Sequence, residues 1–310
     1  MMVAVLIATG QATGQSRLES EFKLVVPSDQ REAIWEYLSQ AYGPNGRVLK
    51  QLGPNFSATF ATDEFLDRYF DTPRLPLFDS NSGLRHRTRH VVQGVDRSKD
   101  GRQLVQLKLG TEDQSGVVRE EIKFKTRKNP GKTRDNDDQL PCLGLVKRSE
   151  RRALRTHLST LSIEPRDLTE VATLFQVRQR TYISENGQPF ATITLDRVMG
   201  RRWIYTISFD EMELELNEMA FTEADEAGRE RMTRLNTLMK EDLFANFPDL
   251  KQDQTPKYNK AVNLLREKDP FFQESLTWGG RPEFLLLIPL LLMGWAVRKF
   301  WRHRASETES

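Results

Sequence analysis

The sequence is poor in the side chains that build disulfide frameworks and transition-metal sites. It contains a single cysteine, Cys142, and only four histidines among 310 residues. One cysteine excludes an internal disulfide and any zinc site built from several thiolates. His86 and His90 lie in a segment with strand character, where a spacing of four does not bring two side chains together. We therefore expect any bound metal to be a hard cation held by carboxylates, such as Mg²⁺ or Mn²⁺.

A large excess of charge of one sign is also missing. The chain has 46 lysines and arginines against 44 aspartates and glutamates, which gives a net charge of +2. Charged residues make up 29% and hydrophobic residues 38%, so the composition indicates a globular chain rather than a disordered one. This balance provides no overall basic field, and we expect no nucleic-acid partner. Any anion site must come from a local arrangement of basic side chains.

Long uncharged runs are rare, and one of them lies near the C-terminus. Residues 284–297, "FLLLIPLLLMGWAV", are 14 residues without charge, whereas a membrane-spanning helix needs about 20. Adding residues 298–301, whose long side chains can reach the lipid interface, gives 18 residues. Flanking tryptophans and basic residues favour a transmembrane or membrane-anchoring helix over 284–301, in contact with lipid. A buried helix is the alternative.

The rest of the chain divides around this segment. Residues 1–17 carry no basic region before their short apolar run, which indicates a disordered tail rather than a signal peptide. We expect a main domain at 18–262, a juxtamembrane linker at 263–283 and a polar tail at 302–310. Without a secretory signal, the domain is expected in the cytoplasm, at a membrane. The basic residues after the run also favour the cytoplasm, but a single membrane pass cannot place both ends there. Two topologies therefore stay open: a tail anchor, which we favour, and a shallow segment that enters the membrane and returns.

Strand and helix patterns alternate along the main domain. The predicted strands lie at 18–26, 65–72, 83–91, 102–110, 117–126, 174–184, 190–198, 203–209 and 211–218. The predicted helices lie at 29–42, 145–172, 222–246 and 257–268, and a polar loop lies at 128–141. Strands in meander-like succession with inserted helices predict an α+β fold with a large antiparallel sheet or barrel.

The predicted strands divide their charges unevenly. The first strand, "SRLESEFKLVVP", places Glu19, Glu21 and Lys23 on one face and apolar residues on the other. Later strands carry rows of one sign, with Arg85, Arg87 and Arg89 on one strand and Glu211, Glu213 and Glu215 on another. A solvated face is the ordinary interpretation of one such strand, but like charges in a row repel by up to about 1 kcal/mol per close pair. This repulsion is compensated if the sheet closes into a barrel with the charges inside. The basic rows would then bind a polyanion, and the glutamates would bind a metal that bridges to it.

Taken in order, these motifs resemble the CYTH family of triphosphate tunnel metalloenzymes. "ESEFK" is similar to the family's ExExK signature, and "YFDTP", "LRHRTR", "QLKLG", "REEIK", "TLDRV", "ELEL" and "PKY" resemble its later segments. The resemblance implies a closed antiparallel β-barrel of eight strands, surrounded by helices, which binds a triphosphate end-on with divalent metal. The chain departs from the family pattern in a long insert at 128–172, in the missing serine before "PKY", and in its hydrophobic C-terminal segment.

The charged rows and the resemblance together give each candidate residue an expected role. The catalytic candidates are Glu19, Glu21, Asp196 and Lys257. The metal ligands are expected to be Glu19, Glu21, Glu121, Asp196, Glu213 and Glu215. The triphosphate-binding residues are expected to be Lys23, Arg85, Arg87, Lys108, Arg119, Lys123, Arg178 and Arg180. Internal ion pairing is the alternative for the basic set, a turn cap for Asp196, and a surface position for Lys257.

Four functions are compatible with such a site. The first is hydrolysis of inorganic triphosphate or of a nucleoside or thiamine triphosphate, in which a positioned water attacks the terminal phosphorus. The second is a class IV adenylate cyclase, which needs a base-binding pocket that the sequence does not mark. The third is a polyphosphate polymerase of the VTC type. The fourth is a polyphosphate sensor, which intact glutamate pairs disfavour because anion binding alone needs no carboxylates.

Overall fold

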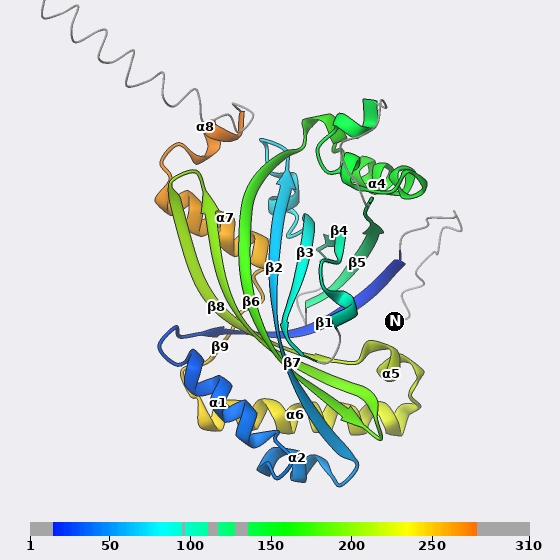
Figure 1. Cartoon of the computed structure of the whole chain (residues 1–310), viewed down its shortest axis with the longest axis vertical. Helices are drawn as coiled ribbons and strands as arrows, with labels where there is room; N and C mark the ends of the chain where they lie inside the picture. The colour runs from blue at the N-terminus through cyan, green and yellow to red at the C-terminus, as the bar shows by residue number, and fades with distance from the viewer. Residues whose placement is uncertain (1–14, 95–96, 111–116, 128–135, 278–310) are drawn as a thin grey trace, which may run out of the picture.

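A computed structural model of the chain describes residues 15–94, 97–110, 117–127 and 136–277 (Figure 1). Its centre is a single antiparallel sheet, as the alternating patterns predict. The strands are β1 (Gln15–Val26), β2 (Phe56–Asp71), β3 (Gly83–Gln93), β4 (Gln103–Leu109), β5 (Val117–Lys125), β6 (Thr169–Glu185), β7 (Gln188–Arg202), β8 (Tyr205–Leu216) and β9 (Lys251–Gln252).

The sheet curls around a concave face but is not closed along its length. Its order is β5-β4-β3-β2-β6-β7-β8-β1-β9, and β5 also pairs with β1. The two halves of β1 have different partners, because Gln15–Glu21 pair with β5 and Glu21–Val26 pair with β8. Only Glu21 pairs with both neighbours. The predicted closed barrel of eight strands is therefore wrong: the staggered β1 leaves the sheet without continuous closure, and β9 adds a ninth strand beside β1.

Helices pack against the sheet in two groups, each with its own hydrophobic core (Figure 1). The helices are α1 (Arg31–Ala41), α2 (Arg47–Leu52), α3 (Pro76–Asp79), α4 (Arg148–Thr160), α5 (Glu218–Glu223), α6 (Glu226–Asn246), α7 (Lys257–Lys268) and α8 (Phe272–Thr277). One core joins the sheet to α1, α2 and α6 through residues such as Ile34, Ile193 and Met239. The other joins it to α4, α7 and α8 through residues such as Phe124 and Leu154.

The two-residue period of the strands separates these cores from the charged face. In β8, Met212 and Leu214 are buried in the helix-covered core, while Glu211 and Glu213, which alternate with them, point to the concave side. Burying each such apolar side chain contributes about 1.5–3 kcal/mol, which fixes the register of the strand. The apolar face thus determines where the glutamates lie.

Several element boundaries differ from the sequence prediction. The predicted helix at 145–172 ends at Thr160, and β6 begins at Thr169. The two strands predicted at 203–209 and 211–218 form one strand, β8 (Tyr205–Leu216). The interrupting Asp210 is buried, and its Oδ1 lies 3.4 Å from Arg31 Nε and 3.2 Å from Arg197 Nε. The helix predicted at 257–268 is confirmed with both ends correct.

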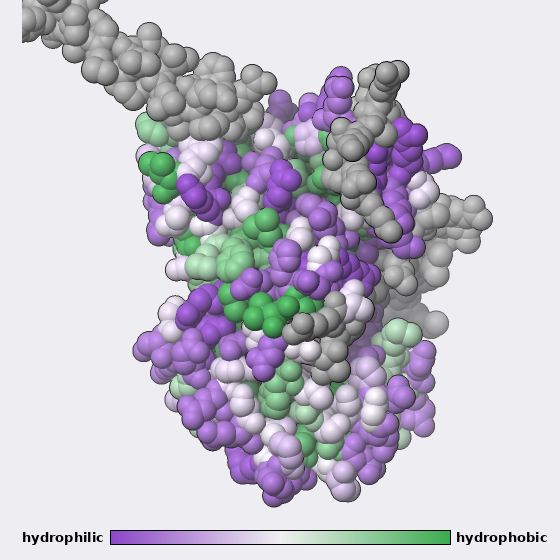
Figure 2. Space-filling view, in the orientation of Figure 1, coloured by the Kyte–Doolittle hydropathy of each residue, from purple (hydrophilic) through white to green (hydrophobic). Residues whose placement is uncertain are grey.

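The membrane prediction finds no support. Within the ranges that the model describes, no helix combines the length and the apolar character needed to cross a bilayer. The predicted membrane helix at 284–301 and the tail at 302–310 lie outside the described residues. Hydrophilic side chains cover most of the face in Figure 2, and its hydrophobic ones form small patches. We therefore withdraw the predictions of a membrane helix, of lipid contact and of a membrane location.

Candidate active site

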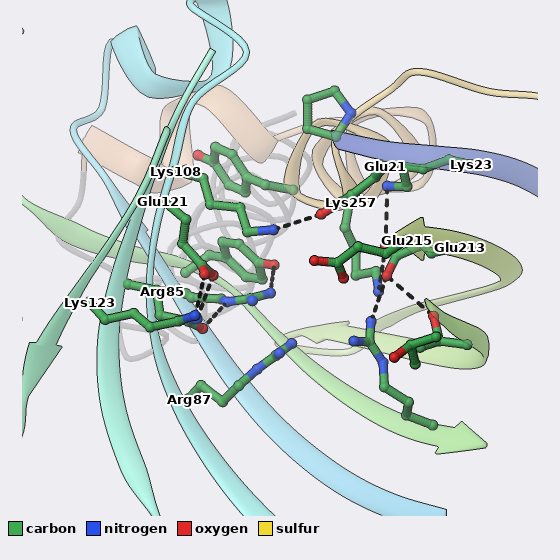
Figure 3. Close-up of a pocket in the computed structure, with 18 of the residues that line it drawn as sticks. Glu21, Lys23, Arg85, Arg87, Lys108, Glu121, Lys123, Glu213, Glu215 and Lys257 are labelled. Carbon is green, nitrogen blue, oxygen red and sulfur yellow. Dashed lines mark hydrogen bonds and ion pairs between the residues drawn. The ribbon is translucent and has the colours of Figure 1, made fainter. Parts of the chain in front are cut away.

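The concave face of the sheet encloses a cavity of about 320 Å³ (Figure 3). Strands from β1 to β8 and the start of α7 contribute its lining. Nine basic side chains line it: Lys23, Arg85, Arg87, Arg89, Lys108, Lys123, Arg178, Arg180 and Lys257. Four glutamates line it: Glu21, Glu121, Glu213 and Glu215. The lining thus presents more basic than acidic side chains to the cavity, which suits it to an anion.

A cluster of three carboxylates lies at one wall of the cavity, where Glu213 lines the cavity and the other two are buried beside it. Asp196 comes from β7, and Glu211 and Glu213 come from β8, directly beside it in the sheet. Each offers an oxygen, and these oxygens lie within 4.8 Å of one another. Asp196 and Glu211 are fully buried. Such a set of oxygen donors fits Mg²⁺ or Mn²⁺.

Two lysines and an arginine neutralise this cluster. Lys257 Nζ lies 2.5 Å from Asp196 Oδ2, 2.8 Å from Glu211 Oε1 and 3.9 Å from Glu213 Oε1. Lys23 Nζ lies 3.6 Å from both Glu211 Oε1 and Glu213 Oε1. Arg178 donates to both oxygens of Asp196 at 2.6 and 2.5 Å. Because unpaired buried charges are unfavourable, these contacts offset the free-energy cost of burying the carboxylates.

The pKa values follow from this pairing. Burial raises the pKa of Asp196, but Arg178 and Lys257 outweigh it and lower the pKa to about 2. Burial likewise raises the pKa of Glu213, while Lys257, Arg178 and Lys23 hold it well below its usual range. Burial lowers the pKa of Lys257, but the three carboxylates raise it above its usual range. At neutral pH Asp196 and Glu213 are therefore ionised and Lys257 is a cation.

The opposite wall is basic, and its arginines are held by aspartates from β2. Arg87 donates to Oδ1 and Oδ2 of Asp67, both at 2.6 Å, and Arg85 donates to Asp67 Oδ2 at 3.1 Å. Arg89 donates to both oxygens of Asp63 at 3.0 and 2.9 Å, and Arg180 also pairs with Asp63. Burial raises the pKa of Asp67, but Arg87 and Arg85 outweigh it and lower it. The arginines of this wall therefore have fixed orientations.

The third side of the cavity alternates acidic and basic groups. Lys108 Nζ donates to Glu21 Oε1 at 3.0 Å. Burial raises the pKa of Glu21, but Lys108 outweighs this effect and lowers the pKa to about 2. Lys123 pairs with the buried Glu121. Glu215 lies opposite Glu21 in the β1–β8 ladder. Figure 3 shows Glu21, Glu213 and Glu215 on one side of the cavity and Glu121 on the other, beside Arg85.

All candidate residues except Glu19 and Arg119 thus lie in the lining of the cavity or directly beside it. Glu19 and Arg119 face each other in the β1–β5 ladder, and their side chains lie outside the part of the chain that the structure describes. Glu121 lies among Gln106 and Lys123, away from the three-carboxylate cluster. The structure gives Glu121 the surroundings of an ion-paired residue.

Sequence reasoning missed the groups that orient the predicted ones. Glu211 stands in the recognised glutamate row but was not among the expected ligands. Asp63 and Asp67 share one face of β2 with Phe65, whose ring centroid lies 4.3 Å from the guanidinium carbon of Arg87. The available signal was the spacing of Asp63, Asp67 and Asp71, which puts all three on one strand face.

Helix α7 is positioned by a second buried network. Tyr258 follows Lys257, stacks on Tyr69 with ring centroids 5.1 Å apart, and donates to Asp71 Oδ2 at 3.0 Å. Asp71 also accepts from the backbone N–H groups of Thr72, Leu77 and Phe78. Burial raises the pKa of Asp71 to about 6 although these hydrogen bonds oppose the change. This network ties the first turn of α7, and hence Lys257, to the end of β2.

The family model described as the CYTH domain matches residues 41–243, which is more than half of the chain. The chain therefore belongs to the CYTH family. Membership supports an enzyme that acts on triphosphates, and the acidic cluster fits the metal dependence of this family. No curated protein gives a significant match.

Solved structures with a related fold include cyclase-like proteins and triphosphatases. A putative adenylyl cyclase of Hippeastrum, described as having a dominant triphosphatase activity, is 18% identical with a TM-score of 0.47, covering 79% of this chain and 95% of that one. A putative adenylate cyclase of Bacillus halodurans is 18% identical with a TM-score of 0.44, covering 74% and 90%. An RNA triphosphatase of S. pombe is 11% identical with a TM-score of 0.33, covering 73% and 81%. TM-scores below 0.5 are too low to assign this chain an activity.

Proposed function

We propose that the protein hydrolyses a triphosphate with the help of Mg²⁺ or Mn²⁺. The observation that carries this proposal is a cavity with a basic wall on one side and, on the other, a cluster of three carboxylates of which Glu213 lines the cavity. Asp63 and Asp67 orient arginines, but a cavity that only binds anions does not need three further carboxylates clustered together, since each of them repels the ligand. Carboxylates beside an anion site are useful when a divalent cation joins the two.

The basic residues would hold the phosphates. Arg85 and Arg87 keep fixed guanidinium planes through Asp67, so little entropy is lost when their remaining N–H groups bind phosphate oxygens. Lys108, Arg178 and Arg180 extend the positive lining along the cavity. Phosphoryl transfer needs neutralised oxygens and in-line geometry more than covalent help, and this lining can provide both.

The carboxylates would hold the metal and orient water. Asp196, Glu211 and Glu213 have the donor set for a hard cation, with Glu21 and Glu215 close by on β1 and β8. A bound divalent ion would supply neutralisation of phosphate charge and polarisation of the attacked phosphorus. With their low pKa values, Glu21, Asp196 and Glu213 are ionised at neutral pH and can accept a hydrogen bond from the attacking water. Lys257 would balance the charge of this wall.

Product analysis with the full chain tests this proposal. The protein is incubated with inorganic triphosphate or ATP, with Mg²⁺, Mn²⁺ or a chelator, and phosphate, pyrophosphate, cyclic AMP and polyphosphate are resolved. We expect phosphate with a diphosphate product, only when metal is present. Cyclic AMP or polyphosphate as the main product would replace hydrolysis by a cyclase or a polymerase, and binding without turnover would indicate a sensor.

A further inference from the structure

One apolar ring lies on the charged face of the sheet. Phe65 of β2 is 3% exposed, yet it belongs to neither of the two hydrophobic cores that the described residues form. The period of two along β2 places it between Asp63 and Asp67, on the face that carries the basic wall. Both aspartates are fully buried. Packing against the helices therefore does not explain this ring, and its charged neighbours have to account for it.

Four arginines gather around the ring of Phe65. Two come from β3 and two from β6, the strands on either side of β2. The distances from the ring centroid to the guanidinium carbons are 4.3 Å for Arg87, 5.3 Å for Arg180, 5.8 Å for Arg178 and 5.9 Å for Arg89. All four lie within the distance of about 6 Å at which the negative face of an aromatic ring attracts a cation. The ring is thus a common contact for cations that otherwise repel one another.

The aspartates of β2 do not give each arginine a partner of its own. Asp63 pairs with both Arg89 and Arg180, and Asp67 is likewise shared by two arginines. Burial and the neighbouring Arg178 lower the pKa of Arg180, as expected where positive charge is in excess. Buried charge without full compensation destabilises a fold. Something besides the two aspartates therefore has to stabilise this group of guanidinium ions.

An aromatic ring offsets the excess of positive charge differently from a further carboxylate. A carboxylate accepts hydrogen bonds from N–H groups and repels an incoming anion, whereas a ring attracts the cation through its π face. Arg87 donates Nε and Nη2 to Asp67, and Arg89 donates Nε and Nη2 to Asp63. Within the described part of the chain, Nη1 of both arginines is left over for a ligand. The ring can thus steady these guanidinium groups without occupying their remaining donors.

We propose that Phe65 is a positioning residue of the anion site, whose ring holds the four surrounding guanidinium groups together and leaves their donors to the ligand. The inference rests on the proposed function, because it takes that ligand to be a triphosphate. Without the ring, the arginines would move apart in the free protein, and the ligand would have to bring them back together at a cost in affinity. The affinity should therefore depend on the charge distribution of the ring as well as on its size.

Fluorinated phenylalanines separate this role from packing. Mono-, di- and trifluorinated phenylalanine in place of Phe65, in the full chain, weaken the attraction of the π face for cations stepwise, while the ring stays apolar and nearly keeps its shape. We expect the urea midpoint of unfolding to fall along the series. We expect the calorimetric Kd of inorganic triphosphate, measured in chelator, to rise at least about fivefold over the series and about tenfold in Phe65→Leu.

The matched control is the same series of fluorinated rings in place of Phe190. This residue is also 3% exposed, but its ring packs on Phe56 within a hydrophobic core, with the ring centroids 5.1 Å apart. We expect the control series to leave the Kd unchanged.

The two readouts have separate outcomes that overturn the proposal. A urea midpoint that stays constant or rises along the series at Phe65 would assign the ring a packing role alone. A midpoint that falls while the Kd stays constant would limit the ring to stabilising the fold. A wild type that binds no triphosphate would instead overturn the proposed function, and the urea midpoints would still decide whether the ring holds the arginines.

Discussion

Single buried charges in this molecule are understood through their partners. Asp67 is fully buried and accepts from Arg85, Arg87 and Gln176. Removing one partner of a buried ion pair leaves the other charge unpaired in a low-dielectric interior, which lowers the free energy of unfolding by several kcal/mol. Arginines that form a row in the sequence therefore alternate with aspartates in space, and they stabilise the sheet before any ligand binds.

The first prediction concerns Arg87→Ala. The row of arginines alone implied that removing one would relieve repulsion and raise stability, but the double hydrogen bond to Asp67 reverses that expectation. We expect the free energy of unfolding to fall by about 3 kcal/mol and triphosphate binding to weaken by about 1.5–3 kcal/mol. Urea unfolding and calorimetry measure the two effects. Arg152→Ala, at an exposed position on α4, is the control, and an Arg87 variant as stable as this control would disprove the pairing argument.

The second prediction concerns Glu211, the cluster member that the sequence analysis left out. Glu211→Gln keeps the side-chain shape but removes one of the three charges in the cluster. We expect kcat/KM for inorganic triphosphate to fall roughly 100-fold, because less charge remains to hold the metal. Exposed Glu241 on α6 provides the matched control, Glu241→Gln. Activity of Glu211→Gln within threefold of the control, at saturating metal, would remove Glu211 from the site.

Elements decide how these residues meet, and here the sequence was informative only in part. The period of two along β1, β3 and β8 predicts which side chains share a face. A shift of the strand register by one residue would move every charged side chain into the hydrophobic core, so the register is well determined. The stagger of β1 between β5 and β8 depends on pairing between distant strands, which no local pattern encodes. The two-residue β9 is too short to leave a periodic signal. The role of Asp71 was hidden because its partners come from the backbone of α3 and from α7.

The third prediction concerns the pH dependence of the contact between β2 and α7. The pKa of Asp71 is raised to about 6 in the folded protein, above its ordinary value of 3.8. Its effect on stability is therefore most favourable below pH 3.8 and is lost as pH rises through about 6. We expect the free energy of unfolding to increase as pH falls from 7 to 5. Urea unfolding across this range measures it, and a slope that persists in Asp71→Asn would assign the effect to another group.

At lower pH the cavity carboxylates act in the opposite direction. The pKa values of Glu21 and Asp196 are lowered to about 2, so their stabilisation is complete above their unfolded values, 4.5 and 3.8, and is lost as pH falls toward 2. The unfolding free energy should therefore pass through a maximum near pH 5. A stability that kept rising down to pH 3 would show that these ion pairs do not stabilise the fold.

At the scale of the whole molecule, a nearly neutral chain concentrates its positive charge in one cavity and sets an acidic cluster beside it. Metal and triphosphate therefore should bind with positive coupling, because each neutralises the charge that the other meets. We expect Mg²⁺ to lower the Kd of a non-hydrolysable triphosphate analogue at least about tenfold. The same titration with Asp196→Asn corrects for metal that binds the anion in free solution, and equal coupling in the two proteins would place the metal elsewhere.

The most direct test of the central claim is the rate of phosphate release from inorganic triphosphate during a Mg²⁺ titration, measured in parallel for the wild type and Glu213→Gln. Glu213 lies at the centre of the charge network, within 4 Å of Lys23, Arg178 and Lys257. The account predicts no release in chelator, saturable release with metal, and a rate at least about 100-fold lower in Glu213→Gln, with folding preserved. Release that continues in chelator, or an equal rate in the variant, would contradict metal-dependent hydrolysis in this cavity.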